Sequence, residues 1–80
     1  MDINEYKLRP SKHFMTTWMR KWDCDIPSLK EAINNAYKID KVGKQKYEVY
    51  IKSKGDSRKL IFIKDEETKE IFIITGAEGK

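Results

Sequence analysis

The sequence is poor in the residues that build covalent or metal-centred chemistry. Among its 80 residues there is one cysteine, Cys24, and one histidine, His13. A single cysteine cannot form an internal disulfide, which favours a reducing compartment. The two residues also lack the ligand spacing of a zinc or iron site, and there is no phosphate-binding glycine loop or nucleophile motif. We therefore expect neither a metal nor another cofactor.

Long apolar runs are also missing. No stretch approaches the length of a membrane span, and the N-terminal residues lack the features of a secretory signal peptide. The sequence therefore predicts a cytoplasmic protein with no membrane partner. A chain of 80 residues has room for one domain with one core, so any active site is expected to be a shallow groove.

Charge is abundant, and the positive charge is concentrated in the middle of the chain. Seventeen lysine and arginine residues against thirteen aspartate and glutamate residues give a net charge of +4 and a pI near 9.2. Residues 38–59 hold eight of the basic residues and three of the acidic ones. A polyanionic partner such as RNA explains this distribution, and so does a well-solvated surface.

Two helices are predicted in the N-terminal half. Ser11 suits the N-cap of a helix over residues 11–22. A second helix is expected over residues 26–36, capped either by Asp25 or by Ser28 in a capping box. The apolar residues of the first helix recur at helical spacing and predict a stripe that faces the core, namely Phe14, Met15, Trp18, Met19 and Trp22.

After residue 37 the apolar period changes from helical spacing to alternation. A short strand is expected around residues 39–42, and a weak alternation over residues 3–9 indicates an N-terminal strand. The fold class is therefore α+β, with two N-terminal helices packed on one face of an antiparallel meander. Gly76 is expected to end the last of the three main strands, which span residues 46–52, 59–64 and 71–75.

The last two predicted strands are apolar on both faces, which exceeds what two short helices can bury. Alternation divides these residues into two sets, and parity alone does not say which set meets the helices. The uncovered set is expected to bind a partner, either a second copy or another protein, unless other segments of the chain cover it. One set is Leu60, Phe62, Ile71 and Ile73, and the other, our candidate partner-binding set, is Ile61, Ile63, Phe72 and Ile74.

The first candidate catalytic site lies on the first helix. Cleavage of RNA by its own 2′-hydroxyl needs a base, an acid and a cation near the phosphate. His13 is the only histidine, the residue type most used as a general acid or base, and the positive end of a helix favours the neutral imidazole that suits a general base. Arg20 lies on the same helix face, roughly 10 Å along the axis, within reach of a neighbouring phosphate. A solvated surface pair is the alternative.

The second candidate site lies on the predicted strands. Tyr50 is interleaved with lysines, a pattern that suits a surface tracking a nucleic-acid backbone and stacking its bases. If chemistry occurs on the sheet, Tyr50 is the expected catalytic residue. Strand lysines that prevent edge-to-edge aggregation explain the same pattern. The basic members of this candidate nucleic-acid-binding surface are Lys44, Lys46, Lys52, Arg58 and Lys59.

The order of short strand, helix, helix and antiparallel meander is carried by residues 6–11, 26–36, 42–43, 46–50, 59–63 and 71–75. This order resembles the RelE/ParE-like toxin superfamily over nearly the whole chain. Ser11-Lys12-His13 at the start of the first helix is similar to a branch of small uncharacterised proteins related to these toxins.

This resemblance implies a toxin that is neutralised by a cognate antitoxin and acts on RNA or the translation machinery. Many such toxins are ribosome-associated, metal-independent mRNA endonucleases, whereas relatives with the same fold poison DNA gyrase. The nuclease members form their site from basic and aromatic residues on the sheet. Lys46, Tyr50 and Lys59 are the positions that correspond to it here. The alternative function is a non-catalytic module that binds nucleic acid or protein through the same sheet.

Overall fold

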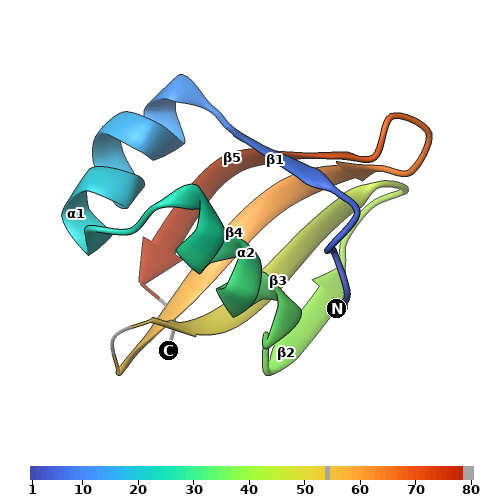
Figure 1. Ribbon diagram of the computed structural model, residues 1–80. Coiled ribbons are helices and arrows are strands. Elements are labelled where there is room, and N and C mark those ends of the chain that lie inside the picture. The colour runs from blue at the N-terminus through green and yellow to red at the C-terminus, as the bar shows by residue number, and fades with distance from the viewer. Residues whose placement is uncertain (54, 79–80) are drawn as a thin grey trace.

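A computed structural model describes residues 1–53 and 55–78 of the chain. These residues form one mixed sheet, with the helical segments between its first strand and the other four (Figure 1). The elements in chain order are β1 (Lys7–Pro10), η1 (Phe14–Met19), α1 (Arg20–Trp22), α2 (Ile26–Asn34), β2 (Lys38–Lys41), β3 (Lys46–Ser53), β4 (Asp56–Asp65) and β5 (Glu70–Glu78).

The five strands lie in the order β1-β5-β4-β3-β2. Four of them form an antiparallel meander, but β1 pairs with β5 in parallel, with Leu8 beside Ile71. The predicted α+β class is therefore confirmed, and the prediction of a wholly antiparallel sheet is wrong. Apolar alternation carries no information on strand direction. The long chain path from β1 to β5 supplies the crossover that parallel pairing needs.

Ser11 fixes the start of the first helical segment. Its Oγ accepts a hydrogen bond from the Phe14 amide at 3.0 Å and donates one to the Ile74 carbonyl at 2.8 Å, so the cap also ties the helix to β5. The next turns, η1, are a π-helix and not the expected α-helix. Because π-helical hydrogen bonds span five residues, the side chains do not follow the α-helical spacing from which the apolar stripe was predicted. Phe14 and Trp22 are buried, but Met15 is 46% exposed, so placing it in the core was wrong.

The second helix, α2, begins at Ile26 with Asp25 as its N-cap, one of the two caps that the sequence allowed. The Asp25 carboxylate accepts a hydrogen bond from the Ser28 amide at 2.9 Å. This bond, which favours the ionised form, lowers the pKa of Asp25. Leu29 and Ile33 lie one turn apart on the same helix face and are buried in the core.

The burial pattern decides which apolar set of the last two strands meets the helices. Leu60, Phe62, Ile71 and Ile73 are fully buried in the same cluster as Phe14, Trp22, Leu29 and Ile33. Figure 1 shows both helical segments on one side of the sheet, with α2 crossing in front of β3 and β4. The alternate set therefore lies on the other side of the sheet, away from the helices.

A β-bulge in β5 adjusts this alternation near the strand end. Ile61 pairs with Thr75 and Phe62 with Ile73, which leaves Ile74 as the extra residue. Gly76, three residues after Ile73, consequently faces the helices as Ile73 does. The expectation that Gly76 ends the strand was wrong, because β5 continues to Glu78.

Candidate nucleic-acid interface

The side of the sheet opposite the helices, called the open face below, is organised in three rows that cross the strands. The first row starts at the β2 edge and contains charged and aromatic residues. The second row contains acidic and apolar residues. The third row is apolar and has a basic residue at each end. In this order the rows are Lys38-Tyr50-Lys59-Ala77, Asp40-Glu48-Ile61-Thr75, and Lys46-Ile63-Phe72-Arg9.

Two tyrosines and three lysines gather at the β2 end of the open face. The rings of Tyr37 and Tyr50 have centroids 6.2 Å apart at an interplanar angle of 47°, and Tyr37 is 53% exposed. Lys52 Nζ lies 5.8 Å from the centre of the Tyr37 ring, and Lys38 Nζ lies 5.1 Å from that of Tyr50. Lys59 is directly opposite Tyr50 on the next strand. These five residues are called the tyrosine–lysine cluster.

Two of the cluster's lysines have acidic neighbours. Lys59 Nζ lies 3.6 Å from a Glu48 oxygen, and Lys38 Nζ lies 3.8 Å from an Asp40 oxygen. Ion pairs at this distance on a solvated surface contribute about 0–1 kcal/mol. Both ammonium groups can therefore exchange a carboxylate for a phosphate at little cost.

The remaining candidate residues on the open face form its apolar part. Phe72 is exposed, whereas Ile61, Ile63 and Ile74 are half-buried. Lys46 lies at the end of the row that contains Ile63 and Phe72. Lys44, by contrast, is exposed in the connection between β2 and β3, outside the rows.

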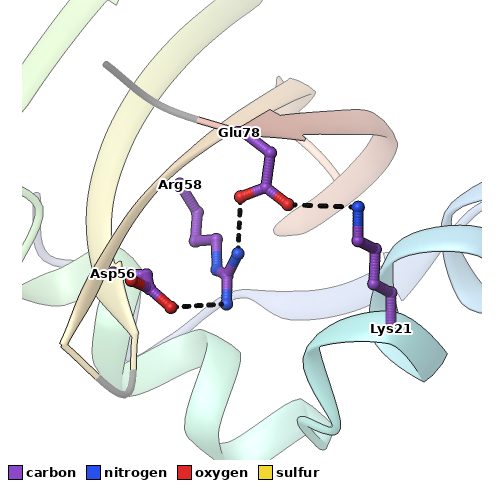
Figure 2. Close-up of polar contacts among 4 residues, drawn as sticks. All are labelled: Lys21, Asp56, Arg58 and Glu78. Carbon is purple, nitrogen blue, oxygen red and sulfur yellow. Dashed lines mark hydrogen bonds and ion pairs between the residues drawn. The ribbon is translucent and has the colours of Figure 1, made fainter.

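Arg58 lies on the other side of the sheet, apart from the other basic candidates. Its side chain is only 12% exposed, and its Cζ lies 5.0 Å from the centre of the Trp22 ring. Figure 2 shows its guanidinium between two carboxylates, with Nη1 2.5 Å from Glu78 and Nη2 3.4 Å from Asp56. Lys21 reaches the other Glu78 oxygen from α1 at 3.3 Å. Arg58 therefore joins β4, β5 and the first helical segment.

The Glu78 carboxylate in this network has a lowered pKa. Its desolvation favours the neutral acid and raises the pKa, but hydrogen bonds and charge from Arg58 and Lys21 together outweigh this. A depressed pKa in the folded state means that the ionised carboxylate stabilises the fold above the ordinary pKa of 4.5. This contribution is lost as the pH falls through the lowered value.

Glu78→Gln is therefore expected to destabilise the protein at neutral pH, with a difference from the unsubstituted protein that narrows below pH 4.5 and then vanishes. Urea unfolding measured across the acid range would follow this difference. Glu67→Gln, in the exposed turn between β4 and β5, is the matched control for loss of one carboxylate. The same pH profile for both variants would contradict the role given to Glu78.

The structure does not bring the three candidate catalytic residues together. His13 and Arg20 are exposed on the first helical segment, which packs on one side of the sheet. Tyr50 belongs to the open face, since its neighbours Val49 and Ile51 point into the core. With the sheet between them, Tyr50 and His13 cannot act on one phosphate.

Sequence reasoning missed two members of the tyrosine–lysine cluster, Tyr37 and Lys38. Both lie just before residues 39–42, where the short strand was expected. The signal was nevertheless present, because Tyr37-Lys38 repeats the pairing of aromatic and basic residues seen in Lys46-Tyr47. The register of β2 against β3 then sets Lys38 beside Tyr50.

The described part of the chain contains no enclosed pocket and no group of three or more histidine, cysteine, aspartate or glutamate residues arranged for a metal. Among the same residues, none of the helices has both the length and the apolar character that crossing a membrane requires. The features that remain for assigning a function are surface features.

A scan against protein-family models, a search of curated proteins and a search of solved structures each found no match to this chain. The resemblance to RelE/ParE-like toxins stays a prediction from the order of the elements. The residues of the open face are therefore the basis for the functional proposal.

Proposed function

We propose that this protein binds single-stranded RNA through the open face of its sheet. The observation that carries the proposal is the tyrosine–lysine cluster, in which two neighbouring tyrosine rings each have a lysine ammonium group within 6 Å of the ring centre. Aromatic rings on a sheet stack unpaired bases, and the surrounding cations neutralise the backbone. The flexible lysine side chains can leave the rings for phosphates when a base enters.

A single strand fits this surface better than a duplex. Stacking on a ring needs a base whose flat face is free, and paired bases in a helix do not offer one. The third row adds Phe72 as a further exposed ring, with Arg9 beside it on β1. The open face thus presents aromatic side chains at two places, with a cation next to each.

The toxin-like activity that the sequence resemblance implies is proposed to act through the same binding, on RNA or on the translation machinery. No cleavage step is assigned, since His13 and Arg20 lie on the helix side. On this account, growth arrest on expression would be abolished by substitutions in the tyrosine–lysine cluster. Arrest that persists in those variants would separate toxicity from the open face.

Lys52→Ala is expected to weaken binding to single-stranded RNA of about 10 nucleotides and to reduce the salt slope of log K by roughly 0.7, the value of one phosphate contact. Fluorescence anisotropy at several salt concentrations measures both. Lys12→Ala, which removes another exposed lysine, at the helix start, should leave the slope unchanged. Equal effects of the two substitutions, or tighter binding to a duplex of the same sequence, would contradict the proposal.

A further inference from the structure

Strand β2 forms one edge of the sheet, and large apolar side chains are exposed in and beside it. The described residues include five large hydrophobic side chains that are exposed, and three of them lie in or beside β2: Tyr37 at 53%, Ile39 at 41% and Val42 at 49%. An edge strand with exposed apolar side chains offers its backbone for pairing with another strand.

The hydrogen bonds to β3 show which backbone groups of β2 are available. The Val42 amide donates to the Lys46 carbonyl at 2.9 Å, so residues 42, 40 and 38 face β3 in alternation. Ile39 and Lys41 must then direct their N–H and C=O groups outward. Outside the strand ladders, no backbone hydrogen bond among the described residues involves either residue.

We propose that β2 pairs antiparallel with β2 of a second copy, about a twofold axis at Ile39, to join two sheets into one. In an antiparallel pair, residues that direct their N–H and C=O groups outward must lie opposite residues that do the same. A symmetric pair of β2 strands meets this condition only when the twofold axis passes through a residue, which can be residue 38, 39, 40 or 41. Three of these registers place a charged residue opposite itself, namely Lys38, Asp40 or Lys41. Like charges directly opposite each other across a strand pair destabilise it.

Only the register centred on Ile39 is complementary in charge. It sets Lys38 of each copy opposite Asp40 of the other. Ile39 meets Ile39 of the second copy as a hydrogen-bonded pair, which uses the outward N–H and C=O groups of both.

The two edges of the sheet differ in a way that favours β2. At the opposite edge, β1 ends in Pro10, which has no N–H to donate to a further strand. Lysines on an edge strand usually discourage pairing, but here Asp40 lies between Lys38 and Lys41 and gives a second copy a complementary charge. The pairing uses the edge of the sheet and does not depend on RNA binding by the open face.

A cysteine scan of β2 tests the register directly. Cys24 is first replaced by serine, and single cysteines are then placed at residue 38, 39, 40 or 41 of the full chain. Ile39→Cys alone should form a disulfide dimer under mild oxidation, because a hydrogen-bonded pair has Cα atoms about 5.5 Å apart, within disulfide range. The other positions lie two or more residues away from their own copies. Preferential cross-linking at one of them would overturn the proposal.

Charge reversal tests the same contact without cross-linking. Asp40→Lys should raise the dissociation constant of the dimer at least about tenfold in sedimentation experiments, since two attractive pairs become repulsive. The double variant Lys38→Asp/Asp40→Lys should restore the dimer, because the pairs are merely exchanged. Within the chain, Asp40→Lys places a lysine opposite Glu48 on β3. Because these charges are opposite in sign, the substitution should not destabilise the fold. A chain that stays monomeric at all concentrations, or a double variant that folds without dimerising, would overturn the proposal.

Discussion

Gly76→Ala is expected to lower the free energy of unfolding by about 1–3 kcal/mol, the usual cost of forcing extra atoms into a packed core. A Cβ atom at this position would lie 2.7 Å from Cη2 of Trp22 and 3.1 Å from Cε1 of Phe14. The Lys59 carbonyl oxygen on β4 is 3.3 Å from the same position. The new methyl group would therefore be held between the aromatic rings and the backbone of β4, and it could not move away from one without approaching the other. For a domain of this size the midpoint of thermal unfolding should fall by roughly 5–20 °C.

The destabilisation can be assigned to this contact by a second substitution. Trp22→Phe removes the ring atom nearest the new Cβ, so its cost and that of Gly76→Ala should not add in a double-mutant cycle. Gly43→Ala is the control for loss of a glycine, because that residue is exposed in a connection and a Cβ there would meet only Lys46, at 3.2 Å from its Cβ and 3.9 Å from its amide nitrogen. Additive effects in the cycle would show that the close approach of Trp22 to Gly76 is not the cause.

Replacing Tyr37 and Tyr50 together by alanine is expected to weaken binding to single-stranded RNA at least about 30-fold. Base stacking on an aromatic side chain contributes about 1–3 kcal/mol per base, and two platforms are removed. Both rings are at the surface of the open face, so the core cluster is untouched. Titration of a labelled single strand by fluorescence anisotropy gives the two dissociation constants.

Tyr50→Phe is the matched control for this pair of substitutions, since it keeps the stacking ring and removes only the hydroxyl. It should bind RNA as the unsubstituted protein does. Unchanged affinity in the double alanine variant would contradict a stacking role for the rings. A loss of affinity as large in Tyr50→Phe would instead assign the effect to the hydroxyl group.

The sequence predicted most of the meander because alternation marks half-buried strands well. It could not give the direction of β1, since pairing partners depend on the chain path. Met15 was misplaced because a period of 3.6 residues was assumed where the segment is a π-helix. Gly76 was misread as a strand end, although its small size is needed where Trp22 approaches the sheet.

The candidate site was predicted less completely than the fold. Strand alternation identified Tyr50 with Lys52, and nearness in the expected hairpin added Lys59. The same nearness also added Arg58, whose parity on β4 places it with Trp22 on the helix side. Strand parity would have distinguished these residues had the start of β4 been known to include Arg58. Tyr37 joined the cluster only through the pairing of β2 with β3, which no local pattern encodes.

The most direct measurement of the central claim is the change in backbone amide signals of isotope-labelled protein on adding unlabelled single-stranded RNA. Binding on the open face predicts the largest shifts at Lys38, Tyr50 and Lys59, with the helix side little changed. Shifts centred on His13 and Arg20, with the open face unaffected, would contradict the account and return the RNA to the first helical segment.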